Sequence, residues 1–209
     1  LLVDNAESGA DWSVENVNLQ AGAWSIPPVA PTGGGARQDP PTDFDGSGRC
    51  FVTQDGPGNT DVDGGPTRLI SCAFDLSGLA DPYLSFAAWM NTTGDDLMEI
   101  AVSSDNGGTW TTMMSLSTTN GWEVFTHRVS DYVAPSAATR LRFSVADTGT
   151  GSIVEAGIDC VDLTGEPQWM RRMIDAHHDR AAETGARVVH ACGFDSVPSD
   201  LGVRFLQDR

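Results

Sequence analysis

Closely spaced aspartates occur in the stretch 59–64, which reads Asn-Thr-Asp-Val-Asp-Gly. Asp61 and Asp63 are two residues apart, and Gly64 permits the sharp turn that calcium-binding loops use. Carboxylate oxygens are the hard ligands that Ca²⁺ prefers. An EF-hand is excluded, because the last ligand position of such a loop would be Ile70 rather than Glu. The pattern favours a cation site at the edge of another fold. The alternative is a group of solvated turn carboxylates.

A second motif, Ser103–Trp110, matches the pattern S-x-D-x-G-x-T-W. In this pattern Asp105 is expected to accept backbone N–H groups across a hairpin turn, Gly107 takes a positive φ, and Trp110 packs beneath the turn. The motif also occurs in sialidases, which raises the possibility of a glycosidase. A single copy on a hairpin is interpreted here as structural.

The densest group of carboxylates comprises Asp95, Asp96 and Glu99. Hydrolysis of a glycosidic bond requires two carboxyl groups about 5–9 Å apart in a cleft. Asp96 alternates with the apolar Leu97 on the expected strand and would therefore face solvent. No catalytic residue is predicted.

The cysteines include a candidate disulfide pair and no metal-binding spacing. Cys50 and Cys72 lie on two expected strands, which makes them the candidate pair in an exported protein. Cys160 and Cys192 belong near or within a different C-terminal segment, where reduced thiols are expected. The separations of 22, 88 and 32 residues do not resemble zinc ligation.

The tryptophans include one candidate for ligand contact. Flat aromatic rings hold sugar rings through apolar contact. Trp24 lies beside a proline-rich stretch at 27–41 and is the tryptophan least typical of a core. We therefore name Trp24 as a possible ligand contact.

Short alternating segments must position these groups. Leu141, Phe143 and Val145 place apolar side chains on one face of a strand, as in a half-buried sheet. Turn sequences such as Asp-Asn-Gly-Gly at 105–108 separate the segments. The expected strands are 12–17, 49–53, 68–74, 82–90, 97–103, 109–116, 122–129, 140–146 and 153–161. Regular short strands without helical periodicity predict an antiparallel two-sheet sandwich.

Charge and hydropathy exclude two classes of partner, nucleic acids and membranes. The 209-residue chain has 12 arginines, no lysine and 29 acidic residues, which gives a net charge of −17. Residues 1–160 hold 21 acidic and 6 basic residues and residues 161–209 hold 8 and 6, so the net charges are −15 and −2. Phosphate recognition requires a basic surface, so no nucleic acid is expected as a partner. No apolar run approaches the roughly 20 residues of a membrane helix, so no membrane partner is expected.

The composition changes near residue 160, and the pattern changes with it. The stretch 167–185 predicts a helix, with Pro167 in its first turn and Gly185 as its end. A strand at 186–191 and the beginning of a second helix after 195 are expected to follow. This order is typical of an α/β protein rather than of a sandwich.

Ordered motifs in the first part carry a resemblance to a known family. They are Cys50-Phe-Val-Thr-Gln, Asp61-Val-Asp-Gly-Gly-Pro-Thr-Arg-Leu, Phe74-Asp-Leu-Ser-Gly, Asp81-Pro-Tyr-Leu-Ser-Phe and Glu155-Ala-Gly-Ile-Asp159. Residues 1–160 resemble the MAM-like jelly-roll modules of secreted bacterial hydrolases and surface proteins. The resemblance implies a mainly β, antiparallel jelly roll with a structural calcium ion and no catalytic centre.

In such jelly rolls one ion ties together the first strand, a middle loop and the last strand. The resemblance therefore implies Ca²⁺ as a structural cofactor. The implied ligands are Asp4 or Glu7, Asp61 or Asp63, and Asp159, with Asp39 or Asp43 as a further candidate.

The second part resembles a different family. Its motifs are Asp162-Leu-Thr-Gly-Glu-Pro-Gln-Trp and His190-Ala-Cys-Gly-Phe-Asp-Ser-Val-Pro-Ser-Asp-Leu-Gly. Residues 161–209 resemble the saccharopine-dehydrogenase-like reductases, which include the trans-acting enoyl reductases. Such enzymes begin with a Rossmann unit and its G-x-G-x-x-G loop. The glycine pairs at 46/48, 56/58 and 149/151 all lack the third glycine, so an incomplete Rossmann-type fragment is expected.

Together these observations predict a sandwich module at 1–160 followed by a reductase fragment at 161–209. The expected function is that of a noncatalytic, calcium-stabilised accessory module, which binds a glycan or a cell-surface protein. A monomer that is secreted or held at the cell surface of a bacterium is expected, although the tail alone would indicate the cytoplasm. The alternatives are an NAD(P)-dependent oxidoreductase fragment and a structural stalk without a ligand. The junction is either a natural fusion or an assembly join.

Overall fold

The computed structural model describes residues 9–26, 28–32, 39–54, 60–79, 81–149 and 153–159. The chain divides into two units, Leu2–Asp162 and a second unit that comprises Leu1 and Leu163–Arg209. All of the described residues belong to the first unit. The predicted helix at 167–185, the strand at 186–191 and the helix after 195 lie outside the described residues.

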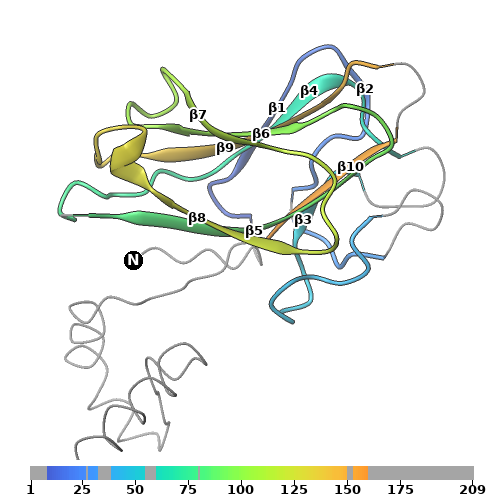
Figure 1. Cartoon of the computed structure of the whole chain (residues 1–209), viewed down its shortest axis with the longest axis horizontal. Coiled ribbons are helices and arrows are strands. Elements are labelled where there is room, and N and C mark those ends of the chain that lie inside the picture. The colour runs from blue at the N-terminus through green and yellow to red at the C-terminus, as the bar shows by residue number, and fades with distance from the viewer. Residues whose placement is uncertain are drawn as a thin grey trace, which may run out of the picture. The chain divides into compact units, whose positions relative to one another are not determined.

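Two antiparallel sheets face each other in the first unit (Figure 1). The larger sheet has the order β1-β4-β9-β6-β7, and β2 also pairs with β4. Its strands are β1 (Ser13–Asn16), β2 (Leu19–Ala21), β4 (Asp63–Ile70), β6 (Met98–Ser103), β7 (Thr111–Leu116) and β9 (Arg140–Asp147). The smaller sheet has the order β3-β10-β5-β8. Its strands are β3 (Phe51–Val52), β5 (Tyr83–Thr92), β8 (Glu123–Arg128) and β10 (Val154–Asp159).

The predicted antiparallel two-sheet jelly-roll sandwich is confirmed. Every strand pair is antiparallel. The described ranges contain no α-helix, and their single helical element is a turn of 3-10 helix at Val129–Asp131. No helix in these ranges has both the length and the apolar character that a membrane crossing requires.

The core fills the space between the two sheets. On β9, Leu141, Phe143 and Val145 are buried in the core cluster, as their alternation predicts. Phe143 meets Phe86 of β5 edge to face, with ring centroids 5.1 Å apart. This contact joins the larger sheet to the smaller one, since each strand presents every second side chain to the interior.

The observed β4 differs from the expected strand at 68–74. It begins at Asp63 and ends at Ile70. Gly64 and Gly65 have φ of 75° and 106° and lie inside the strand, where the register with β9 shifts before Thr67. Positive φ at glycine lets a strand continue through a bulge, which in the sequence resembles a turn. The short β2 that pairs with this bulged region was not expected.

The last strand, β10, is buried on both faces. Val154, Ala156 and Ile158 belong to the core cluster. Glu155, Gly157 and Asp159 alternate with them and therefore point to the outer face of the smaller sheet. Two carboxylates on a covered outer face require a covering segment and a means of stabilising their charge.

Candidate metal centre

Residues 39–49, here called the strap, lie over the outer face of β10. A Cβ at Gly157 would be 2.9 Å from Pro40 Cγ and 2.9 Å from Trp122 Cη2, which is closer than real Cβ atoms approach. The indole Nε1 of Trp122 donates a hydrogen bond of 2.7 Å to the carbonyl oxygen of Thr42. Glycine at 157 therefore allows the strap to pack directly on the strand, above the residue that separates Glu155 from Asp159.

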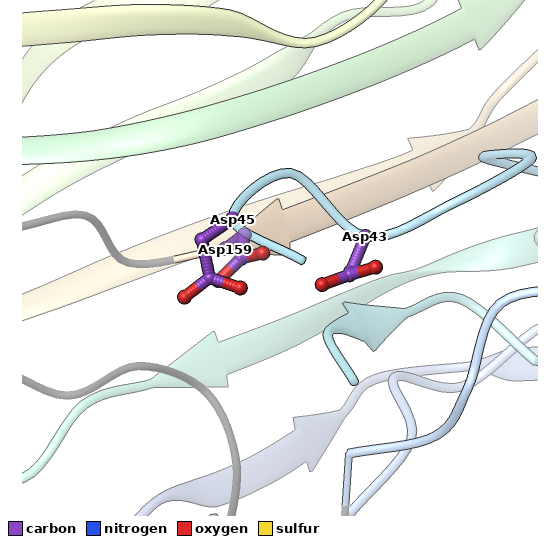
Figure 2. A group of neighbouring side chains, drawn as sticks. All are labelled: Asp43, Asp45 and Asp159. Atoms are coloured by element: carbon purple, nitrogen blue, oxygen red, sulfur yellow. The ribbon is translucent and has the colours of Figure 1, made fainter. Parts of the chain in front are cut away.

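Three carboxylates meet where the strap passes the end of β10. We call Asp43, Asp45 and Asp159 the outer carboxylate group (Figure 2). One oxygen from each residue lies within 4.8 Å of the other two. Asp159 is fully buried, Asp43 is half-buried and Asp45 is exposed. The group is therefore anchored in the protein on one side and open to solvent on the other.

Backbone donors within the strap hold the two loop carboxylates. The amide of Gly48 donates to Asp43 Oδ2 at 2.9 Å, and the amide of Ser47 donates to Asp45 Oδ1 at 2.8 Å. The Gly48 hydrogen bond lowers the pKa of Asp43 below its usual value. Asp43 is therefore ionised at neutral pH and available as a ligand.

Asp159 has one satisfied oxygen and one unsatisfied oxygen. Its Oδ2 accepts a hydrogen bond of 3.0 Å from the amide of Phe44. Its Oδ1 is buried and has no hydrogen-bond partner among the described residues. Burial, opposed by the hydrogen bond from the Phe44 amide and reinforced by the charges of Asp45 and Asp43, raises the pKa of Asp159 to about 7. The free lone pairs of Oδ1 suit a cation.

A second set of carboxylates lies at the other end of the strap. We call Asp39, Asp61 and Glu155 the inner carboxylate group. Their side chains are 2%, 3% and 0% exposed. The hydroxyl of the buried Thr53 donates to Glu155 Oε2 at 2.8 Å. Glu155 Oε1 is buried and has no hydrogen-bond partner among the described residues.

The charges of Asp39 and Asp61 both act on Glu155. Burial raises the pKa of Glu155 to about 9, and the negative charges of Asp39 and Asp61 contribute to the rise. The hydrogen bond from Thr53 acts in the opposite direction. Without a counter-ion the inner carboxylate group therefore retains a proton on Glu155 at neutral pH.

The donor set of both groups is that of a hard divalent cation. A buried carboxylate oxygen without a hydrogen-bond partner among the described residues, such as Asp159 Oδ1 or Glu155 Oε1, is costly, and a metal ion or a proton stabilises it. Each group consists of carboxylates alone, without the His or Cys that zinc prefers. Ca²⁺ takes 6–8 oxygen ligands at about 2.3–2.6 Å and accepts irregular geometry. The oxygens of the outer carboxylate group lie close enough together to fit Ca²⁺. The inner carboxylate group supplies the same kind of oxygen ligand.

The structure divides the ligand set that the sequence predicted. The predicted ligands were Asp4, Glu7, Asp61, Asp63 and Asp159. Asp4 and Glu7 lie outside the described residues. Asp61 belongs to the inner carboxylate group and Asp159 to the outer one, whereas Asp63 is half-buried at the first residue of β4. The further candidates Asp39 and Asp43 also fall one in each group.

Strand geometry explains this division. Glu155 and Asp159 are four residues apart on one face of β10, a separation of about 13 Å. Each of the two carboxylates therefore lies beside a different set of acidic residues. Neither Glu155 nor Asp45 was among the predicted ligands. The sequence could have predicted Glu155 as a ligand, because Glu155 shares the outer face of an otherwise apolar strand with Asp159.

The other predicted site residues do not meet their expected roles in the described part of the chain. Trp24 is 3% exposed and belongs to the core cluster, so its ring has almost no surface for a ligand. Cys50 and Cys72 are thiols and do not form the predicted disulfide. The backbone of Cys50 pairs with that of Val29 beside β3 of the smaller sheet. Cys72, in contrast, follows β4 of the larger sheet.

The motif at 103–110 forms a structural hairpin turn. Asp105 Oδ1 accepts the amide of Thr109 at 2.8 Å, and Asp105 Oδ2 accepts the hydroxyl of Thr109 at 2.8 Å. Gly107 has a φ of 91°. The Trp110 ring lies next to Gly107, and the Arg142 guanidinium lies 4.7 Å from its centroid. The contacts of Asp105, the φ of Gly107 and the packing of Trp110 against the turn agree with the structural role that the sequence predicted, whereas the Arg142 contact was not predicted.

Comparison with known sequences finds relatives for a short part of the chain. No protein-family model matches it. A Mycobacterium tuberculosis protein described as a trans-acting enoyl reductase is 71% identical over 48 residues, which are 23% of this chain and 12% of that protein. A saccharopine dehydrogenase-like oxidoreductase of Arabidopsis thaliana is 48% identical over 59 residues, 28% of this chain and 13% of that protein. The chain thus spans a small part of these relatives, and the predicted resemblance to this group of reductases is confirmed over that short length.

Solved structures of β-sandwich modules are similar to a larger part of the chain. The K1 cleaved adhesin domain of Lys-gingipain from Porphyromonas gingivalis has a TM-score of 0.49 and 15% identity, with 79% of this chain and 98% of that chain covered. The structure of TmCBM61 with β-1,4-galactotriose has a TM-score of 0.42 and 11% identity, with 73% and 87% covered. These neighbours are adhesin and carbohydrate-binding modules. The MAM-like family stays a prediction.

Proposed function

We propose that the sandwich is a noncatalytic accessory binding module of the MAM-like kind, in an exported protein, stabilised by a calcium ion in the inner carboxylate group. The observation that carries this proposal is the burial of Glu155 against Asp39 and Asp61, with Glu155 Oε1 lacking a hydrogen-bond partner among the described residues. A glycan or a protein on another surface would be the ligand.

The ion would connect three segments that are distant in the sequence. Asp39 begins the strap, Asp61 lies two residues before β4, and Glu155 lies on the last strand. A cation shared by these carboxylates would replace their repulsion with attraction and hold the strap on β10. Calcium sites of extracellular modules bind at about 10⁻⁴–10⁻³ M, so an exported location would supply enough ion.

Thermal unfolding of the full chain tests this function. Calcium in about hundred-fold excess over its Kd would contribute about 2.7 kcal/mol, which corresponds to a rise in Tm of about 5–10 °C for a domain of this size. Tryptophan fluorescence in EDTA and in added Ca²⁺ measures this difference. Equal Tm values in the two solutions would remove calcium from the proposed function.

The short reductase match supports a second candidate, an NAD(P)-dependent oxidoreductase of which this chain is a fragment. Its support is the 71% identity over 48 residues with a protein described as a trans-acting enoyl reductase. The G-x-G-x-x-G loop that binds the pyrophosphate of the cofactor in such enzymes does not occur in the sequence given. Titration of the full chain with NADPH decides the matter. A saturable change in fluorescence or Tm would favour the reductase, and no response would favour the binding module.

A further inference from the structure

The outer carboxylate group differs from the inner one in its access to solvent. Its buried member, Asp159, has an Oδ1 without a hydrogen-bond partner among the described residues. Its other members lie on the strap, where Asp45 is exposed and Asp43 is half-buried. One oxygen from each carboxylate supplies three of the 6–8 ligands that Ca²⁺ takes. The coordination positions on the side of Asp45 are therefore open to oxygens from another molecule.

Apolar side chains lie beside this open position. Phe44, between the two strap aspartates, is 37% exposed and meets Trp122 edge to face with centroids 6.4 Å apart. Trp122 packs over Gly157, which precedes Asp159 by two residues on the same face of β10 and thus lies about 7 Å from it. We call Phe44 and Trp122 the aromatic edge.

The pairing of β10, β5 and β8 shows which residues lie beside the aromatic edge and Asp159 on the outer face of the smaller sheet. Asp159 pairs with Ala87 of β5, and Ala87 pairs with Val124 of β8. Directly opposed residues share a face of the sheet, so Val124, which is 41% exposed, lies two strands from Asp159, at about 10 Å. Carboxylates and exposed apolar groups are therefore adjacent on one outer face.

From this juxtaposition we propose that the outer carboxylate group binds Ca²⁺ and that the bound ion, together with the aromatic edge, binds a neutral glycan. Two vicinal hydroxyl groups of the sugar complete the coordination of the ion, and the apolar face of the sugar ring contacts Phe44 and Trp122. The inference rests on the proposed binding function and names its ligand class and its site.

Charge selects a neutral ligand over an acidic one. Three aspartates and one Ca²⁺ leave a net charge of −1 at the site, and the whole chain carries −17. An acidic peptide or a sulfated sugar would be repelled by this field. Hydroxyl groups carry no net charge and still provide the oxygen ligands that the ion requires.

Ion counting tests the metal part of the proposal. The full chain, dialysed against Ca²⁺, should bind about two ions, one in each carboxylate group. Asp45→Asn should lose one ion and remain folded, because Asp45 is exposed on a loop. Asp95→Asn, which changes an exposed aspartate outside both groups, is the matched control and should keep both ions. Retention of both ions by Asp45→Asn would overturn the proposal.

The two proposed calcium sites can be tested separately. If Glu155→Gln loses an ion and Asp45→Asn does not, the inner calcium ion stands and the outer site falls. If Asp45→Asn loses an ion and Glu155→Gln does not, the outer ion stands and the calcium of the proposed function falls. If neither variant loses an ion, both fall.

Sugar binding is measured with methyl α-mannoside and methyl β-galactoside as probes, by the shift of the Trp122 indole ¹H–¹⁵N resonance. A saturable shift is expected in Ca²⁺, and it should disappear in EDTA and in Asp45→Asn. Phe44→Ala should weaken binding, whereas Tyr83→Ala, an exposed aromatic elsewhere on this sheet, should not. No shift with either sugar, a shift that persists in EDTA, or a shift produced only by an acidic peptide would each overturn the glycan site.

Discussion

At the scale of single residues, Glu155 combines complete burial with an unsatisfied oxygen. Its Oε2 is held by Thr53, and its Oε1 has no hydrogen-bond partner in the described ranges. An ionised carboxylate in this position is stable only beside a cation. The same side chain therefore destabilises the metal-free protein and would bind the ion in the metal-bound protein, and a substitution can separate these two effects.

We expect Glu155→Gln to change Tm in opposite directions with and without metal. In EDTA the variant should melt above the native protein at pH 8, because the neutral amide folds without the proton that Glu155 must take up. In Ca²⁺ it should melt below the native protein, because a ligand of the ion is lost. Glu123→Gln, an exposed position on β8, is the control. A decrease in Tm of the same size in both solutions would mean that Glu155 has only a packing role.

The second prediction for a single residue concerns the close packing of the strap on Gly157. A Cβ there would overlap Pro40 and Trp122, both at 2.9 Å, and overpacking of this kind costs about 1–3 kcal/mol. Gly157→Ala should therefore lower the free energy of unfolding by that amount and weaken calcium binding as the strap is displaced. Gly78→Ala is the control, since no atom lies within 4 Å of a Cβ at that position. Equal stability of the two variants in urea would show that the strap does not pack on β10 as described.

At the scale of elements, the hairpin between β6 and β7 depends on the side chain of Asp105. The carboxylate accepts both the amide and the hydroxyl of Thr109, and Ser103 Oγ donates to it at 2.8 Å. These hydrogen bonds lower its pKa, the one from the Thr109 amide most of all. The ionised side chain of Asp105 therefore stabilises the hairpin.

We expect Asp105→Ala to lower Tm by a few degrees at pH 7 and to loosen the β6–β7 hairpin. A group whose pKa is lowered by folding stabilises the protein above its ordinary pKa and loses that contribution in acid. The Tm difference between native and variant proteins should accordingly shrink as the pH falls below about 4. Amide hydrogen exchange of residues 103–110 measures the local effect. Asp95→Ala serves as the reference, and unchanged exchange in Asp105→Ala would contradict the assignment.

At the scale of the whole molecule, the carboxylates of β10 determine how stability depends on pH. In the metal-free protein the pKa values of Glu155 and Asp159 are about 9 and about 7, against ordinary values of 4.5 and 3.8. Between the ordinary and the raised values the folded chain holds protons that the unfolded chain has released. The free energy of unfolding therefore falls as the pH rises from about 4 to about 9.

We expect calcium to flatten this dependence, because the ion replaces the protons on these carboxylates. Urea unfolding of the full chain at pH 5, 7 and 9, in EDTA and in Ca²⁺, measures both curves. Glu155→Gln in EDTA should show a smaller fall than the native protein. A metal-free protein that becomes more stable toward pH 9 would contradict the burial of these two side chains.

The local sequence was sufficient to predict most of the strands and the faces that they bury. Leu141, Phe143 and Val145 alternate with polar residues, and this period places them in the core whatever the partner strand is. Likewise, the spacing within 103–110 predicts its own turn, because the hydrogen bonds of Ser103 and Asp105 within the turn join residues at most four positions apart. β4 was predicted less well, since the Gly64–Gly65 bulge resembles a turn until β2 and β9 pair with it.

Only the tertiary structure decided which carboxylates share a site. Asp39 and Glu155 are more than a hundred positions apart in the sequence, and Asp61 joins them because the strap and the approach to β4 both pass the same point of β10. Composition and spacing predicted an acidic protein with oxygen ligands for a cation. They did not separate Asp61 from Asp159, because the pairing of distant strands, rather than neighbouring residues along the chain, determines that separation.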